Sequence, residues 1–253
     1  MAEAELLDLG RLRRSCAQCS LQQLCLPAGV GAEGLARIDA LVRSRRPVSR
    51  GDRLFRAGDA LSSVYVARTG GFKTVGASAG GEPQLVGFHL PGELIGLDAL
   101  GGGKHRCEAV ALVDSEVCEV TYGRLAEIAA QVPGLHVQLM RVIGGSMGRD
   151  QDHVEILMRR QAVERIALFL HGIGERYARI GQSAHVFKLP MSREDIAHFL
   201  GLALETVSRG FTRLQDDGAI AVRGRRVEIL DMDAIERLAH GGEEDAPPLR
   251  ARS

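Results

Sequence analysis

The sequence lacks any apolar run near the ~18 residues that a membrane-spanning helix requires. It also lacks the basic N-terminus of a signal peptide, since it begins Met-Ala-Glu-Ala-Glu. Neither sign of charge is in excess, because 32 Lys and Arg residues balance 32 Asp and Glu residues. We therefore expect a cytoplasmic protein without membrane contacts, in which any affinity for nucleic acid comes from a local basic patch.

The number of cysteines is odd. The five cysteines are Cys16, Cys19, Cys25, Cys107 and Cys118. An odd count without an export signal argues against a disulfide framework. Three of the five lie in residues 1–30, which have little apolar periodicity and too little material for a core of their own. This segment must therefore pack against another part of the chain or be held by a ligand.

The length of 253 residues favours two modules over one, at roughly 150 residues per domain. Between about residues 46 and 120, glycine-containing turns separate short β-type runs at 63–67, 84–88 and 109–113. Short strands with turns about every ten residues are typical of a β-sandwich, roll or barrel. The first module is therefore predicted to be a β domain.

A long helix is predicted from residue 134 to about residue 160, because no proline interrupts this stretch. Six of its residues repeat with the 3-4-3-4-3 spacing of a coiled-coil seam, which predicts that two copies of the chain pair here. A helix that lies on the β domain is the alternative. The six seam residues are Met140, Ile143, Met147, Asp150, Val154 and Leu157.

Asp150 is the one polar residue of this seam. In a symmetric dimer it would face its own copy, and two carboxylates that lie close together repel each other or share a proton. The seam would then be weak enough for a second input to decide whether the dimer forms.

Residues 191–209 have the pattern of a helix-turn-helix. Ser192 and Asp195 form the S-x-x-D capping box of a first helix, and the small Ala197 allows a second helix to approach. Gly201 provides the turn, and Val207 packs the second helix inward. A helical hairpin without a role in DNA binding is the alternative.

The second helix exposes polar residues near its N-terminal end, where a recognition helix enters the major groove. After it, residues 219–230 are predicted to form a β-hairpin with three arginines at its tip, which would contact the DNA backbone as a wing. Arginines at a loop tip can also be merely solvated. The candidate DNA-binding residues are Glu205, Ser208, Arg209, Arg213, Arg223, Arg225 and Arg226.

A β domain, a long dimer helix and a winged helix-turn-helix, in this order, resemble the cyclic-AMP receptor/FNR superfamily of bacterial transcription regulators. Within it, the run Cys-Ala-Gln-Cys-Ser-Leu-Gln-Gln-Leu-Cys at 16–25 is similar to the N-terminal motif of the fumarate and nitrate reduction type. Residues 87–96 and 148–152 strengthen the match, which spans about residues 16 to 240.

The resemblance implies an α+β fold in five parts. These are a cysteine-rich, cluster-binding segment (1–30), a β-roll sensor domain of the cyclic-nucleotide-binding type (31–132), a dimerisation helix (133–160), a winged helix-turn-helix domain (161–240) and a flexible tail (241–253).

The resemblance also implies one [4Fe–4S] cluster per subunit on Cys16, Cys19, Cys25 and Cys118, with Cys107 an ordinary cysteine. Structural zinc usually takes two close cysteine pairs, whereas here one gap is five residues and the last ligand is alone. Spacing by itself nevertheless leaves an iron–sulfur cluster, zinc and plain thiols open. In similar proteins the positions of Ser20 and Leu24 shield the cluster, although a turn serine and a buried leucine are the simpler interpretation.

The implied function is an oxygen-responsive transcription regulator. Oxygen would convert or destroy the cluster, the homodimer would fall apart, and binding to palindromic TTGAT-type promoter sites in double-stranded DNA would be lost. By the same similarity, loops around residues 80–82 would meet RNA polymerase. We expect no enzyme, because no serine or histidine lies in a recognised catalytic motif.

The alternative is a regulator of the same superfamily that responds to a cyclic nucleotide or another small effector without a cluster. Relatives that bind a nucleotide carry Gly-Glu for the ribose and Arg-Ser for the phosphate. This chain has Gly92 and Glu93, but Arg106 is followed by Cys107, so the serine hydroxyl is missing.

Overall fold

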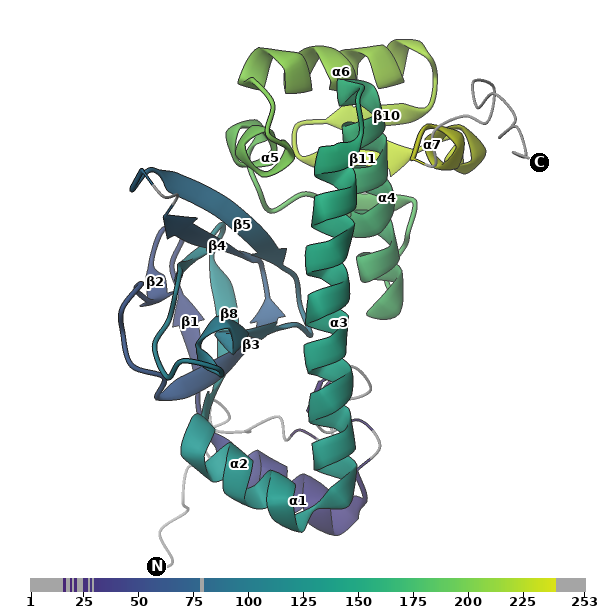
Figure 1. Ribbon diagram of the computed structural model, residues 1–253. Coiled ribbons are helices and arrows are strands. Elements are labelled where there is room, and N and C mark those ends of the chain that lie inside the picture. Colours follow the sequence, from purple (N-terminus) through teal and green to yellow (C-terminus); the bar gives the residue numbers. More distant parts are fainter. Residues whose placement is uncertain are drawn as a thin grey trace, which may run out of the picture.

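The computed structural model describes residues 16, 19, 21, 25, 26, 28, 30–77 and 80–239. A β domain, the long helix α3 and a C-terminal helical domain follow one another along the chain (Figure 1). Ser20, Leu24 and the predicted tail at 241–253 lie outside the described residues.

The β domain consists of two four-stranded antiparallel sheets, with strand orders β1-β8-β3-β6 and β2-β7-β4-β5. Their inner faces enclose an apolar core around Phe72, Ile95 and Val117, all of which are fully buried. The two sheets confirm the predicted β-roll. Its elements are α1 (Ala32–Leu41), β1 (Val42–Val48), β2 (Arg53–Phe55), β3 (Ser63–Thr69), β4 (Phe72–Ala77), β5 (Pro83–His89), β6 (Leu94–Ile95), the 3₁₀ turn η3 (Leu97–Ala99), β7 (Glu108–Ala111), β8 (Ser115–Thr121) and α2 (Tyr122–Gln131).

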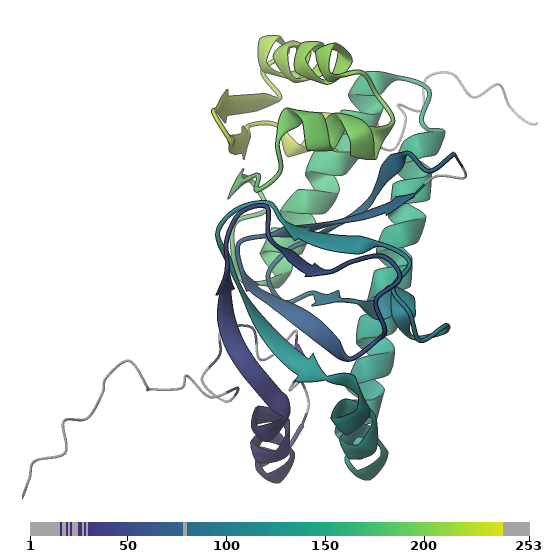
Figure 2. The same ribbon diagram turned by 90° about the vertical axis from the view of Figure 1, so that its left-hand side faces the viewer.

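Helix α3 (Pro133–Met158) is 26 residues long, which corresponds to about 39 Å at 1.5 Å per residue. Pro133 stands in its first turn, where the missing N–H costs nothing. The helix runs alongside the β domain and continues past it to the C-terminal domain (Figures 1 and 2). It ends two residues before the predicted Arg160.

The C-terminal domain combines four helices with a three-stranded sheet of order β10-β11-β9. Helix α6 packs so closely on α4 that a Cβ at Gly210 would lie 2.3 Å from Ile166 Cδ1, so any larger residue would displace that side chain. Ile166, Leu170 and Val207 are fully buried in the shared core. The elements are α4 (Ala162–Arg179), β9 (Val186–Lys188), α5 (Arg193–Leu200), α6 (Leu204–Asp216), β10 (Ile220–Arg223), β11 (Arg226–Ile229) and α7 (Met232–Ala239).

The β domain and the C-terminal domain share an apolar contact. Phe88 of β5 lies against Phe199 of α5, with ring centroids 4.9 Å apart. Beside it, Lys73 Nζ of β4 donates to Asp195 Oδ1 at 2.6 Å. No helix in the described part of the chain is both long and apolar enough to pass through a bilayer.

Candidate cysteine site and DNA interface

Four of the five cysteines line one cavity. Cys118 lies on β8, which is hydrogen-bonded on both sides, to β1 and to β3. Cys16, Cys19 and Cys25 reach the same cavity from the N-terminal segment, although Cys118 is more than ninety residues away in the chain. The rest of the lining is mostly apolar: Leu21, Leu26, Ile38, Val42, Val66 and Val120, together with Arg45 and Arg68.

The surroundings disfavour the charged form of two of these thiols, Cys25 and Cys118. Burial raises the pKa of the Cys25 thiol far above its usual range, and the other three cysteines of the site raise it further. Burial also raises the pKa of Cys118, while the guanidinium groups of Arg45 and Arg68 oppose that shift. Arg45 Nη2 lies 3.6 Å from Cys16 Sγ. The two arginines therefore provide positive charge for any group that carries thiolates here.

The donor set of this cavity consists of four thiols. In the described ranges no three Cys, His, Asp or Glu side chains converge closely enough to hold one metal ion. A four-iron cluster binds one thiolate at each iron, so its ligand sulfurs stand farther apart than the ligands of one zinc ion. Four thiols around one mostly apolar cavity are the donor type that such a cluster requires.

The cysteine segment contacts the start of α3 through a residue that the sequence did not suggest. Gln138 Nε2 donates to the Cys25 carbonyl oxygen at 3.1 Å, and the Gln138 side chain is buried. Leu26 packs in the same apolar cluster as Leu135, one turn before Gln138. Nothing in the local sequence marks Gln138, because its partner is 113 residues away along the chain.

The predicted seam residues lie on α3 with their side chains largely open to solvent. Met140, Met147 and Val154 are 52%, 60% and 56% exposed. Leu157 and Asp150 are also exposed, whereas Ile143 is half-buried. Partial burial raises the pKa of the Asp150 carboxyl, although Arg149 and His153 act in the opposite direction. An exposed apolar stripe of this kind on one helix is typical of a protein interface.

The first helix of the helix-turn-helix begins with the predicted capping box. Ser192 Oγ accepts from the Asp195 amide at 3.0 Å, and Asp195 Oδ2 accepts from the Ser192 amide at 3.0 Å. Gly201 adopts the left-handed conformation, with φ at 62°, and ends the helix. These contacts confirm the predicted motif and place α6 beyond the turn.

The predicted base-contacting residues of helix α6 are exposed to solvent. Glu205 Oε1 and Arg209 Nη2 lie 2.6 Å apart on one exposed face, one turn from each other. Ser208 is exposed and its Oγ donates to the Leu204 carbonyl. Arg213 follows one turn later and is paired at 3.7 Å with Asp217. A base edge that binds Glu205 or Arg209 would therefore compete with their mutual ion pair.

The predicted hairpin is formed by β10 and β11, which meet at a turn that includes Gly224. Arg223 and Arg226 are exposed. Arg225 is half-buried, and its Nη1 donates to the Pro190 carbonyl at 2.7 Å. Arg225 therefore has a contact within the protein that sequence patterns do not reveal.

Comparison with known proteins agrees with this arrangement. The Crp-like helix-turn-helix domain family matches residues 164–238, and the cyclic nucleotide-binding domain family matches residues 45–132. The transcriptional activator protein Anr of Pseudomonas protegens is 44% identical over 229 residues, which cover 90% of this chain and 94% of Anr. The chain belongs to the CRP/FNR family.

Further members of the CRP/FNR family are also similar. The fumarate and nitrate reduction regulatory protein of Escherichia coli (strain K12) is 39% identical over 224 residues, covering 88% of this chain and 90% of that protein. The structure of FixK2 from Bradyrhizobium japonicum superposes with a TM-score of 0.70 and is 29% identical, covering 81% of this chain and 98% of FixK2. Anr is a transcriptional activator by name and the Escherichia coli protein a regulatory protein by name. The helix-turn-helix identifies this family member as a DNA-binding transcription regulator.

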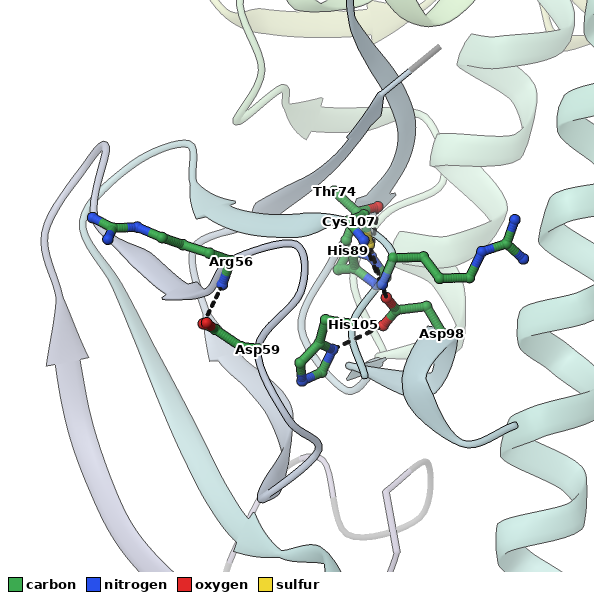
Figure 3. Close-up of polar contacts among 8 residues, drawn as sticks. Arg56, Asp59, Thr74, His89, Asp98, His105 and Cys107 are labelled. Carbon is green, nitrogen blue, oxygen red and sulfur yellow. Dashed lines mark hydrogen bonds and ion pairs between the residues drawn. The ribbon is translucent and has the colours of Figure 1, made fainter. Parts of the chain in front are cut away.

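Two residue pairs match the expected nucleotide-binding positions, Gly92-Glu93 and Arg106-Cys107. In this family member, Glu93 and Cys107 already bind other groups of the protein. Glu93 pairs with Arg176 of α4 at 2.6 Å and accepts from the Leu90 amide at 2.9 Å. Cys107 Sγ donates to Asp98 Oδ2 at 3.3 Å, and burial raises the pKa of this thiol to about 12 (Figure 3). Glu93 and Cys107 line different pockets. The geometry therefore disfavours the nucleotide alternative.

Cys107 itself lies apart from the other four cysteines, in the core between the sheets. His105 Nδ1 lies 3.2 Å from Asp98 Oδ1, and the Arg106 amide donates to Asp98 Oδ2 at 2.7 Å (Figure 3). The Asp98 carboxylate thus holds residues 105–107 in place.

Proposed function

We propose that this chain is an oxygen-responsive regulator of the FNR type, which binds DNA as a homodimer and holds one [4Fe–4S] cluster per subunit. Cys16, Cys19, Cys25 and Cys118 would be the ligands. The observation that carries the proposal is that four thiols from two distant segments line one apolar cavity flanked by two arginines. When bound, the cluster supplies the sensitivity to oxygen.

The protein's own residues would pass this signal to α3. Cluster ligands would lie on both sides of the cavity, with Cys118 on β8 and the other three cysteines on the N-terminal segment. They would hold this segment against β8. Leu26 then stays packed with Leu135, and the Cys25 carbonyl stays on Gln138. Release of the segment would remove both contacts from the first turns of α3, close to Met140 in the seam.

The dimer is proposed to form along the exposed stripe of α3. Paired Asp150 carboxylates oppose its formation, so the seam depends on support from the cysteine segment. Two joined subunits hold two recognition helices on two half-sites, and loss of the dimer lowers DNA affinity through lost bivalency. Each 1.4 kcal/mol in the seam changes the dimer constant about tenfold.

DNA recognition is assigned to Glu205, Ser208 and Arg209 on base edges, with the hairpin arginines on phosphates. We also propose that the exposed turn at 80–82 meets RNA polymerase. The protein would act in the cytoplasm, where its promoters are, and would have no catalytic activity.

The test is anaerobic purification of the full chain, followed by an absorption spectrum and assays of iron and sulfide. We expect a brown protein with about four irons per subunit. Cys118→Ser should abolish the colour, whereas Cys107→Ser, the matched change at the cysteine outside the cavity, should keep it. A colourless, iron-free protein that binds its operator fully would contradict the proposal, and loss of iron only in Cys107→Ser would reassign the fourth ligand.

A further inference from the structure

A second pocket, of about 460 Å³, lies where α3 and α4 pass the turn before β6. Its α3 residues are spaced along one face of the helix, opposite to the seam, so a dimer through the seam leaves the pocket open. It does not include the four cysteines of the cysteine cavity or Cys107, although the pocket beside Cys107 also reaches Arg149 and Arg176. The lining residues are Ala28, Pro91, Gly92, Glu93, Gln138, Arg141, Val142, Gly145, Arg149, Arg176, Arg179 and Ile180.

The pocket concentrates positive charge in a chain whose net charge is zero. Four of its described lining residues are arginines and one, Glu93, is an acid, which leaves a formal charge of +3. Arg176 already uses that acid fully, with Nε and Nη2 at 2.8 and 2.6 Å from the two Glu93 oxygens. Arg141, Arg149 and Arg179 share the rest of the space, and Glu93 is the one carboxylate among the described lining residues.

Arg149 is the most informative of these residues. Its Nη2 is buried and has no hydrogen-bond partner in the described part of the protein. Burial lowers the pKa of the guanidinium, and the like charges of Arg176 and Arg179 lower it further, although Glu93 and Asp150 act in the opposite direction. A buried donor on a charged group is costly to leave unpaired, which favours an anionic partner close to this side chain.

We propose that this pocket binds a small phosphorylated molecule. Guanidinium groups bind phosphoryl oxygens through paired N–H donors, and a phosphate dianion can face several arginines at once. The volume exceeds that of bare phosphate and lies in the range of small-molecule sites. Pro91, Val142 and Ile180 would receive the less polar part of the molecule.

The proposal goes beyond oxygen sensing and does not depend on the cluster. A ligand here would contact α3 and α4 together, on the same helix face as Gln138, whose amide holds Cys25. A phosphorylated compound could therefore favour one position of the cysteine segment over another, since a ligand shifts an equilibrium by its difference in affinity for the two states.

The test is titration calorimetry on the full chain, kept anaerobic, with pyrophosphate, inorganic phosphate and malonate as probes at physiological salt. We expect saturable binding of pyrophosphate at least about tenfold tighter than that of malonate. Arg149→Gln and Arg179→Gln should each weaken pyrophosphate binding at least about tenfold. Arg124→Gln, at an exposed site on α2 outside the pocket, should bind like the parent.

Circular dichroism and the thermal midpoint check that Arg149→Gln is folded, and loss of a buried unpaired charge should not lower that midpoint. Absence of saturable binding, equal binding of malonate, or an unchanged affinity in Arg149→Gln would overturn the proposal. Pyrophosphate binding that appears only after deletion of residues 2–10 would overturn it too, because Glu3, Glu5 and Asp8 would then be the pocket's natural anions. Titration of the iron-free chain repeats the test without a cluster, so a failure here is distinct from a failure of the proposed function.

Discussion

The C-terminal domain and the cysteine-bearing segment both contact α3, but different interactions hold each of them in place. Leu170, Val207 and Leu214 are completely buried in a core that joins the helices of the C-terminal domain. The described residues of the cysteine segment form short local turns, such as Cys19 N to Cys16 O, and none of them belongs to a sheet. The C-terminal domain is thus stabilised by its own packing, whereas the cysteine segment depends on a few side chains and on its proposed ligand.

The largest expected effect distinguishes the stability of the C-terminal core from that of the cysteine segment. Leu170→Ala leaves a cavity in the C-terminal core and should lower the free energy of unfolding by about 2–5 kcal/mol, with or without oxygen. Leu26→Ala, its counterpart in the cysteine segment, should lower iron retention and the anaerobic dimer fraction. Hydrogen exchange of the α6 amides measures the first effect, and an iron assay with anaerobic sedimentation measures the second. Equal loss of α6 protection in the two variants would contradict the distinction.

Removal of Asp150 should make the seam independent of the cysteine segment. Asp150→Ala is expected to lower the dimer dissociation constant in air by at least about tenfold, or ~1.4 kcal/mol. Sedimentation in air measures this constant. Asp152→Ala, on the same helix but outside the seam, is the matched control, and a chain that stays monomeric in Asp150→Ala would refute the role of this carboxylate.

The pH dependence follows from the same carboxyl group. Because the pKa of Asp150 is raised, the folded chain binds this proton more tightly than the unfolded chain. The stability linked to Asp150 is therefore complete at low pH and is lost as the pH rises through the raised pKa. Dimerisation in air should strengthen as the pH falls through the raised pKa of Asp150, and Asp150→Ala should flatten this profile.

Within the C-terminal domain, contacts to bases can be compared with contacts to the DNA backbone. Arg209→Ala should relax the preference at one base position by ~1–3 kcal/mol. Arg223→Ala, on the hairpin, should weaken binding to all sequences alike and reduce the salt slope by about one. Competition binding with single-base variants of the operator distinguishes them, and a uniform loss in Arg209→Ala would assign it to phosphate.

The smallest effect concerns the hydrogen bond from Gln138 of α3 to the cysteine segment. Gln138→Leu removes the donor to the Cys25 carbonyl, which should weaken the anaerobic dimer by about 1 kcal/mol, or roughly fivefold. Iron content at purification should stay the same. Sedimentation without oxygen measures the effect, and an unchanged dimer would show that Gln138 does not couple the segment to α3.

Local patterns predicted the elements of this protein well. Ser192, Asp195 and Gly201 specify the start and end of α5, because capping and left-handed turns depend on residues only a few positions apart. The apolar spacing of α3 likewise predicted a stripe that proves exposed around Met140 and Met147. The family resemblance, not the spacing, singled out Cys118 as the fourth thiol, and the structure places it in the same cavity as the other three.

Contacts between distant segments could not be predicted in this way. Glu93 has the position of a ribose ligand in the sequence pattern, yet it pairs with Arg176 of another domain. Arg225 belongs to a basic hairpin tip, yet it also binds the Pro190 carbonyl. In both cases the same charged side chain suits a ligand or a protein partner, and only its neighbours in space decide between them.

The amino-acid sequence alone determined the order of the β domain, long helix and winged helix-turn-helix, since turn, cap and periodicity signals act over a few residues. Only the tertiary structure decided which groups meet. It placed Gln138 on Cys25 and gathered Arg141, Arg149 and Arg179 around one space. The reason is physical: the side chains at these sites come from separate segments, and their proximity follows from packing of the whole chain rather than from any local preference.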